Sequence, residues 1–340
     1  MSAMTGAIPV VSSAIPDPVA RHVAQRPAVV AFGGGHGLSA TLDALRLVTD
    51  RITAVVTVAD DGGSSGRLRE EFGVLPPGDL RMALSALCDD SEWGQTWRDV
   101  LQHRFSTEGP LDSHALGNLL IVALWELLGD NVEGLDWVGR LLGARGRVLP
   151  MASVPLAIEA DVVGDDGSSN VVRGQVAVAK AHGRIEHLRL FPADPPIPDE
   201  VTHALERADW VVLGPGSWFS SILPHLVAPR LRSALTRTPA RRCLTLNIGS
   251  GDEEALGMTA ADHLVSFAEH APGLRIDVVL VDPTEVGDAA ALDAAAARLG
   301  ARVHVSDVRS AQGAAVHDRL RLAAAFGDMF RAAGTTSTGG

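Results

Sequence analysis

The fold is decided by residues 28–61, which read AVVAF GGGHG LSATLDALRLV TDR ITAVVTV ADD. Residues 28–32 are apolar throughout, as in a strand buried on both faces, and they lead directly into a glycine-rich loop. Apolar residues recur at helical spacing over 38–48, with Ser39 as the expected cap. A second buried strand over 52–58 ends in Asp60 and Asp61. The stretch therefore predicts a strand, a loop, a helix and a parallel strand.

The glycine-rich loop consists of Gly33, Gly34, Gly35, His36 and Gly37. Glycine lets backbone N–H groups approach a ligand, and the helix that follows presents the positive end of its dipole. We therefore predict that the loop binds a phosphate or diphosphate, with a purely structural turn as the alternative. Residues 35–40 also match the dinucleotide pattern GxGxxA, which is weak evidence by itself.

A second glycine-rich stretch follows the two acids, over residues 60–69. The acids suit ribose hydroxyls or Mg²⁺, although a solvated strand end would explain them too. Serine hydroxyls and guanidinium groups follow at once, and these favour a functional cluster over a plain turn. The candidate site residues of this stretch are Asp60, Asp61, Ser64, Ser65, Arg67 and Arg69.

Three later segments contribute further candidates. Asp79 and Arg81 follow a proline-rich turn, where Asp79 can serve as a helix N-cap or as a metal ligand if it meets Asp61. His114 and Asn118 stand at the start of an apolar helix, where a ligand-facing pair and a buried polar pair are equally expected. A buried strand followed by a glycine loop occurs again over 210–221. This loop lacks any acid or base, so we expect it to hold a ligand through Gly214, Gly216 and Ser217 without reacting with it.

Strands and helices alternate over most of the chain, which predicts an α/β fold with a doubly wound, mostly parallel, Rossmann-like sheet. The period changes to two within about 155–191, where we expect an antiparallel β-meander insertion. We assign one nucleotide-binding domain to 27–332, a disordered arm to 1–26 and a flexible tail to 333–340. Ligands of such sheets bind at the carboxyl ends of strands, so the loops at Gly33, Asp60, Gly214 and Asn247 should share one cleft.

Composition narrows the classes of function. Apolar residues make up 46% of the 340 residues and the net charge is −12, which argues against nucleic acid or an anionic membrane surface as partner. No apolar run is long enough to span a bilayer and no secretory signal is evident, so we expect a cytoplasmic protein. Cys88 and Cys243 lie far apart and are expected to be buried thiols.

Catalytic machinery is not evident in the sequence. The only lysine is Lys180, so there is no P-loop lysine and one candidate for Schiff-base chemistry. None of the 12 histidines forms an HxH or HExxH pattern, and no GxSxG nucleophile motif occurs. The sequence therefore predicts binding without hydrolysis.

Taken together and in order, these motifs resemble the YvcK-like gluconeogenesis factor family, within the wider superfamily of CofD-like 2-phospho-L-lactate transferases. The resemblance covers about residues 28–325, and its most specific part is DDGGSSGRLR over 60–69. The other matching motifs are GGGHGLS over 33–39, PPGDLR over 76–81, HALGNLL over 114–120 and GPGS over 214–217. Two departures bear on the identity of the ligand: His36 stands where the family usually has Thr, and residues 247–252 differ from the expected segment.

The resemblance implies a non-catalytic protein that binds nucleotide sugars such as UDP-N-acetylglucosamine and supports cell-wall synthesis, cell shape and growth on gluconeogenic carbon sources. It implies a protein partner in the cell wall or metabolism, without naming it, and it is compatible with a homo-oligomer. In this interpretation the glycine loops hold the diphosphate, Asp60 or Asp61 the ribose, and Arg67, Arg69 or Arg81 the remaining charge. No cofactor is required beyond the UDP-sugar ligand, with Mg²⁺ left open.

Two other hypotheses stay open at this stage. The transferase relatives imply a Mg²⁺-dependent transfer of a phospholactyl group to a deazaflavin precursor, with the metal held by acids that look like Asp61 and Asp79. An NAD-dependent oxidoreductase would rest only on GxGxxA and Asp60.

Overall fold

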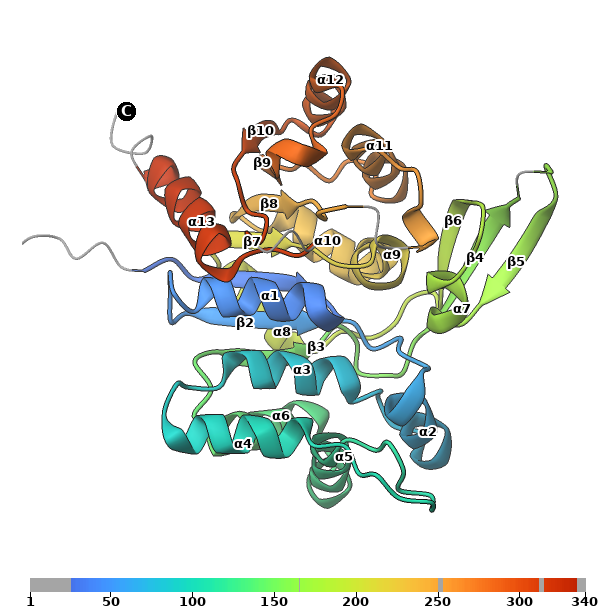
Figure 1. Ribbon diagram of the computed structural model, residues 1–340, viewed down its shortest axis with the longest axis vertical. Helices are drawn as coiled ribbons and strands as arrows, with labels where there is room; N and C mark the ends of the chain where they lie inside the picture. The colour runs from blue at the N-terminus through green and yellow to red at the C-terminus, as the bar shows by residue number, and fades with distance from the viewer. Residues whose placement is uncertain (1–25, 165, 250–252, 312–314, 335–340) are drawn as a thin grey trace, which may run out of the picture.

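A seven-stranded parallel sheet forms the centre of the computed structural model, which describes residues 26–164, 166–249, 253–311 and 315–334 (Figure 1). The strands run in the order β10-β9-β8-β7-β1-β2-β3, and each neighbouring pair is parallel. This arrangement confirms the predicted doubly wound α/β class. The strands are β1 Val29–Gly33, β2 Ile52–Val56, β3 Arg147–Pro150, β7 Trp210–Leu213, β8 Arg241–Thr245, β9 Val278–Val281 and β10 Arg302–Val305.

The strand order reverses at β1, which lies between β2 and β7. From β1 the chain adds β2 and β3 toward one edge, whereas β7 to β10 extend to the other edge. Every residue of β1 is buried, so its apolar sequence is explained by helices on both faces. The connections that leave β1 and β7 diverge at their carboxyl ends, and this is where open α/β sheets form a crevice.

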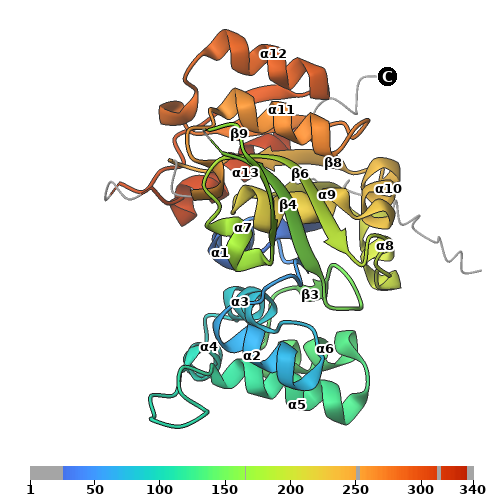
Figure 2. The same cartoon turned by 90° about the vertical axis from the view of Figure 1, so that its right-hand side faces the viewer.

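A three-stranded antiparallel sheet projects from the main body beyond the carboxyl ends of the parallel strands (Figure 2). It consists of β4 Ala157–Val163, β5 Ser169–Arg173 and β6 Arg184–Phe191, which confirms an antiparallel insertion here. The strand order is β5-β4-β6, so β4 is central, whereas a simple meander would place β5 there. The strand expected over 170–180 is wrong after residue 173, because Gly174 has a φ of +98° and the chain continues as the short helix α7 Gln175–Ala179.

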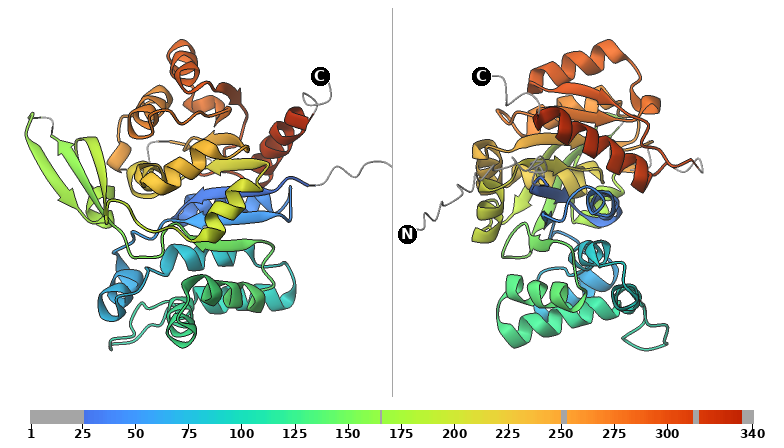
Figure 3. Two further views of the ribbon diagram at one scale, coloured as in Figure 1. Left: turned by 180° about the vertical axis from the view of Figure 1, so that it is seen from behind. Right: turned by 90° about the vertical axis from the view of Figure 1, so that its left-hand side faces the viewer.

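Helices cover both faces of the parallel sheet. On one face α1 Gly35–Leu45 packs between α3 Gly78–Leu87 and α13 Arg319–Gly334, and the opposite face carries α8 Asp199–Glu206 and α10 Pro229–Arg237 (Figure 3). A further group packs beyond α3 and ends in the short connection to β3. It comprises α4 Glu92–Gln102, α5 Leu116–Leu128 and α6 Asn131–Leu141, with α2 Gly63–Phe72 beside α5.

The remaining helices follow the second glycine loop. A π-helical turn over Trp218–Ile222 continues into α9 Leu223–Val227, and Trp218 and Phe219 are buried in the core. The last two crossovers are α11 Ala260–His270, between β8 and β9, and α12 Ala289–Leu299, between β9 and β10. Short 3₁₀ turns lie at Glu253–Ala255 and Pro283–Glu285.

Two predicted helix caps are wrong. Helix α1 begins within the glycine loop at Gly35, four residues before the expected cap, and Ser39 donates to the carbonyl of Gly35 inside the helix. Helix α3 has Pro77 as its N-cap, which places Asp79 in the first turn. The Asp79 carboxylate accepts the N–H of Gly35 from α1, so it links two helices instead of capping its own.

Two smaller expectations concern the cysteines and the chain ends. Cys88 and Cys243 are buried free thiols, as expected. Of the helices described, none has the length and apolar character needed to cross a bilayer. The predicted arm over 1–26 lies outside the described residues except for Arg26, and the predicted tail does so except for 333–334, which end α13.

We expect the fold to lose stability in mild acid because of His225, which is 0% exposed in α9 and packs edge-on against Phe32 of β1. Burial lowers the pKa of His225 from 6.5 to about 4. The neutral ring therefore stabilises the fold fully above pH 6.5, and this contribution is lost as the pH falls from there toward 4. The loss should reach roughly 3 kcal/mol. Urea unfolding of wild type and His225→Phe at pH 7.5 and 4.5 measures it. Any overpacking by Phe is independent of pH. A variant whose stability falls between pH 7.5 and pH 4.5 as much as that of wild type would therefore contradict the assignment.

Candidate functional site

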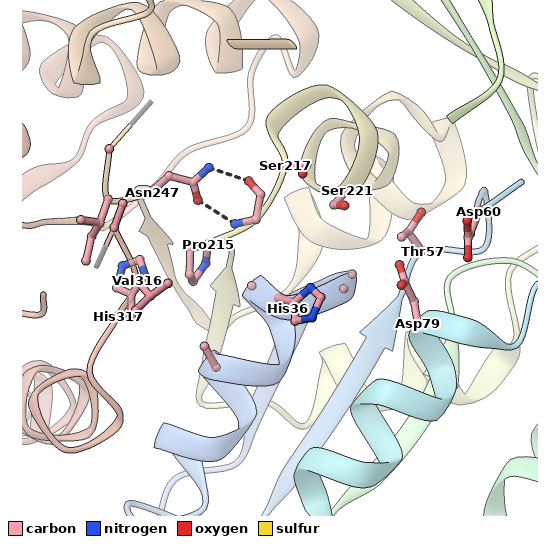
Figure 4. Close-up of a pocket in the computed structure, with 18 of the residues that line it drawn as sticks. His36, Thr57, Asp60, Asp79, Pro215, Ser217, Ser221, Asn247, Val316 and His317 are labelled. Carbon is pink, nitrogen blue, oxygen red and sulfur yellow. Dashed lines mark hydrogen bonds between the residues drawn. The ribbon is translucent and has the colours of Figure 1, made fainter. Parts of the chain in front are cut away.

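A cavity of about 410 Å³ opens at the carboxyl ends of β1, β2, β7 and β8 (Figure 4). The four loops expected to share a cleft do so, since residues of the loops after β1, β2, β7 and β8 all line this cavity. The connection into α13 and the start of α7 complete the wall. The lining residues are Gly34, Gly35, His36, Gly37, Ala40, Thr57, Asp60, Asp79, Gln175, Pro215, Gly216, Ser217, Ser221, Asn247, Ile248, Gly249, Ala315, Val316 and His317.

The two glycine loops cross at very close range beside the cavity. A Cβ added to Gly37 would lie 2.3 Å from the carbonyl oxygen of Pro215 and 2.6 Å from Cα of Gly216. Thr41, one turn further along α1, donates a 3.2 Å hydrogen bond to the carbonyl of Gly214. The first turn of α1 is therefore held against the second loop, with its free N–H groups at the cavity.

The second loop is fixed from the other side by Asn247, at the end of β8. The N–H of Gly216 donates to Oδ1 of Asn247 at 2.8 Å, and Nδ2 of Asn247 donates back to the carbonyl of Gly216 at 2.9 Å (Figure 4). Ser217 and Ser221 line the cavity beside this pair. The amide of Asn247 thus orders the loop, while the serine hydroxyls face the space where a ligand would lie.

One end of the cavity is acidic. It is formed by Thr57, Asp60, Asp79 and Gln175, and we call it the carboxylate end. Burial, with a smaller contribution from the nearby Asp60, raises the pKa of Asp79 from 3.8 to about 7, against the opposing hydrogen bond from Gly35. Burial also raises the pKa of Asp60. Oγ1 of Thr57 is buried without a hydrogen-bond partner among the described residues. A hydroxylated ligand or a divalent cation would relieve this arrangement.

The opposite end of the cavity combines apolar side chains with an imidazole. Ile248, Ala315 and Val316 line it together with His317. Burial lowers the pKa of His317 to about 4, so the ring is neutral at neutral pH. Its Nε2 atom is buried without a hydrogen-bond partner among the described residues. This end suits a flat, uncharged group that offers one polar atom.

Asp61, in contrast, does not line the cavity. Its two carboxylate oxygens accept the N–H groups of Gln175, at 3.0 Å, and Val176, at 2.9 Å, at the start of α7. The expectation that Asp61 and Asp79 would converge on a metal is therefore not met, because the acid that faces Asp79 is Asp60. Within the described ranges no group of three or more His, Cys, Asp or Glu side chains is placed to hold a metal ion.

Four predicted site residues form a buried network behind the cavity. Oγ of Ser64 lies 3.0 Å from Nδ1 of His114 and accepts from Nδ2 of Asn118 at 3.0 Å. Oδ1 of Asn118 accepts from Nε of Arg81 at 2.9 Å, and Arg81 also donates to Gln102. All four side chains are buried, and none is on the cavity lining. The structure therefore places them where they tie α2, α3 and α5 together.

The two arginines of residues 60–69 do not line the cavity. Arg67 donates to the carbonyls of Pro110 and Asp112 in the loop before α5. Arg69 lies near Asp60 without reaching the lining, and Ser65 hydrogen-bonds Asp60. No Lys or Arg occurs among the lining residues that the structure describes. An anion in this cavity would therefore be held by backbone N–H groups and the dipole of α1.

Most predicted residues of the two glycine loops line the cavity, namely Gly34, Gly35, His36, Gly37, Gly216 and Ser217. The other two, Gly33 and Gly214, lie just behind them at the ends of β1 and β7. Ser221, whose hydroxyl was expected to donate to a phosphate or sugar, lines the cavity as well, and Thr57, Gln175 and His317 line it without having been predicted. Thr57 could have been predicted, because it lies three residues before Asp60 at the end of the same strand. Gln175 and His317 could not, because they come from segments far away in the sequence.

Comparison with known proteins places the chain in a family. A family profile described as 2-phospho-L-lactate transferase CofD matches residues 29–319. A putative gluconeogenesis factor of Mycobacterium leprae is 49% identical over 305 residues, covering 88% of this chain and 85% of that protein. The gluconeogenesis factor of Bacillus subtilis is 37% identical over 265 residues, covering 78% and 81%.

The solved structures agree with this assignment. A crystal structure of a UPF0052 family member from Bacillus halodurans aligns with a TM-score of 0.78 and 33% identity, covering 88% of this chain and 99% of that chain. The chain therefore belongs to the CofD family, and its relatives within it are gluconeogenesis factors. The resemblance drawn from the motifs is confirmed.

We expect Gly37→Ala to destabilise the protein, because a Cβ at 2.3 Å from the Pro215 oxygen must push the two glycine loops apart. Overpacking of this kind costs about 1–3 kcal/mol. The matched control is Gly139→Ala in α6, where the nearest atom to an added Cβ is 3.8 Å away. That change should stabilise the helix by about 0.5–1 kcal/mol. Chemical unfolding of both variants provides the test, and a Gly37→Ala protein as stable as wild type would show that the crossing is loose.

We expect Asp79→Asn to stabilise the protein at alkaline pH. The folded-state pKa of Asp79 is raised to about 7, so its protonated form is favoured by folding and stability is lost as the pH rises from 3.8 through 7. The variant should gain on the order of 1–2 kcal/mol at pH 8.5, since the partly exposed carboxyl is screened, and nothing at pH 4. Thermal unfolding across this range decides it. An equal effect at both pH values would contradict the electrostatic explanation.

Proposed function

We propose that this protein binds a nucleotide sugar of the UDP-N-acetylglucosamine type without transforming it, and that the bound state supports cell-wall synthesis, cell shape and growth on gluconeogenic carbon sources. We place this activity in the cytoplasm, with the ligand-bound form read by a protein partner. The observation that carries the proposal is the meeting of two glycine-rich loops at the N-terminus of α1, beside a cavity of about 410 Å³. This volume lies within the range of about 300–1,000 Å³ typical of small-molecule sites.

The chemistry of the cavity matches the three parts of such a ligand. The diphosphate suits the N–H groups of His36 and Gly37 in the first turn of α1, since the N–H of Gly35 already donates to the Asp79 carboxylate. The base suits the end lined by Ile248 and Val316, where apolar contact is available. The hexose suits the carboxylate end, since carboxylates accept hydrogen bonds from hydroxyl groups.

Outside the pair formed by Asp60 and Asp79, the candidate acids and bases are already engaged or poorly suited to proton transfer, which favours binding over catalysis. Asp61 is engaged by α7, and His114 is engaged by Ser64 behind the cavity. His317 lines the cavity, but its lowered pKa of about 4 makes it a poor base at neutral pH. The described lining residues are thus better suited to holding a ligand than to activating one.

A second candidate is a Mg²⁺-dependent transferase of the 2-phospho-L-lactate type, which the family profile favours. Asp60 and Asp79 would hold the cation, because two carboxylates at one end of the cavity offer the hard oxygen ligands that it prefers. A bound Mg²⁺ would neutralise the phosphates of the donor. The carboxylate end would therefore contact the hexose in the first candidate and Mg²⁺ in the second.

Isothermal titration calorimetry distinguishes the candidates. We expect UDP-N-acetylglucosamine to bind with a Kd in about the micromolar range even when EDTA removes divalent cations. NAD⁺ should give no heat. The Gly37→Ala variant should lose binding while its circular dichroism spectrum shows that it is folded. Absence of any heat with a panel of UDP-sugars would refute the binder. Turnover of a lactyl nucleotide and a deazaflavin precursor in Mg²⁺, detected as a phosphodiester by mass spectrometry, would establish the transferase instead.

A further inference from the structure

The insertion sheet is attached to the cavity through one carboxylate. Asp61 follows β2, and both of its oxygens accept N–H groups from the first turn of α7 in the insertion. The fit is close on both sides of this contact. A Cβ on Gly174 would lie 2.4 Å from Oδ2 of Asp61, and a Cβ on Gly62 would lie 2.9 Å from Cγ2 of Val176. The start of α7 therefore has little freedom to shift relative to the strand end.

This attachment brings Gln175 into the cavity. Gln175 is the only insertion residue on the described lining, and it lies at the carboxylate end with Asp60 and Asp79. Its backbone N–H is used by Asp61, whereas no hydrogen bond joins its side-chain amide to any part of the chain that the structure describes. The amide thus offers one acceptor and two donors to a ligand.

The carboxylate end is otherwise poor in hydrogen-bond donors. Ionised Asp60 and Asp79 only accept hydrogen bonds, and the hydroxyl of Thr57 supplies a single proton. A hexose presents hydroxyl groups that both donate and accept, so two acids alone satisfy only its donors. An amide is the side chain that adds donors without adding charge, and Gln175 is placed to do this.

We propose that Gln175 is a specificity-determining residue that contacts the hexose of the nucleotide sugar, and that Asp61 is the positioning residue that holds it there. This inference rests on the function proposed above. It adds that the insertion contacts the hexose end of the ligand. The insertion is then a part of the binding site, joined to the glycine loops by the contact between Asp61 and α7.

The test compares UDP-N-acetylglucosamine with UDP by calorimetry, because UDP lacks the hexose. We expect Gln175→Ala to weaken the sugar nucleotide by about fivefold, as for the loss of one or two hydrogen bonds, and to leave UDP unchanged within about twofold. Lys180→Ala, at the exposed C-terminal end of α7, is the matched control and should change neither. A Gln175→Ala protein that loses both ligands equally, or neither, overturns the specificity role and leaves UDP-sugar binding by wild type standing.

The positioning role has a readout that needs no ligand. Asp61→Asn retains one acceptor for two N–H groups, so hydrogen exchange at Gln175 and Val176 should speed up by about tenfold or more. The same variant should lose part of the preference for UDP-N-acetylglucosamine over UDP, with UDP binding retained. Unchanged exchange at these two amides overturns the role of Asp61. If wild type binds no UDP-sugar, the proposed function fails and the role of Gln175 fails with it, which the wild-type titration alone reveals.

Discussion

The site depends on a steric constraint, the crossing of two backbone loops at a point where Gly37 has no room for a side chain. The carbonyl of Pro215 and Cα of Gly216 occupy the space that a Cβ on Gly37 would need. Thr41 adds a hydrogen bond across the crossing to the carbonyl of Gly214, and Asn247 holds the second loop through both backbone groups of Gly216. The reversal of strand order between β1 and β7 brings the two loops together, and the glycines let them touch.

Polar residues of the shared motifs divide into two sets around this crossing. Those at the strand ends, Asp60, Ser217 and Asn247, face the cavity. Those carried by α2, α3 and α5 satisfy one another in the buried network of Ser64, Arg81, His114 and Asn118. A buried, fully bonded network of this kind fixes helix positions, because breaking one member leaves the others unpaired in a low dielectric. The motif residues thus include a supporting layer as well as a lining.

The fold and half of the site could be predicted because they follow from local rules. Buried apolar strands and glycine loops predicted the parallel sheet, and the rule that ligands lie at the carboxyl ends of strands brought Asp60, Gly216 and Asn247 together. The cap at Ser39 failed because α1 already begins in the glycine loop, and the cap at Asp79 failed because its carboxylate accepts the N–H of Gly35 from the neighbouring helix. The partners of Asp61 and the position of Gln175 depend on how the insertion folds back, and no spacing within residues 60–69 contains that information. The expected contact between Arg67 and the ligand is absent from the cavity lining for a similar reason, since Arg67 donates to backbone carbonyls in the loop before α5.

The lack of any lysine or arginine on the described cavity lining has a consequence for how the protein would work inside a cell. Attraction between full charges weakens as ionic strength rises, whereas short hydrogen bonds from backbone amides are hardly screened. If the proposed ligand is held in this way, its affinity should change little with the salt concentration. Occupancy of the site would then follow the concentration of the ligand rather than the ionic strength of the solution.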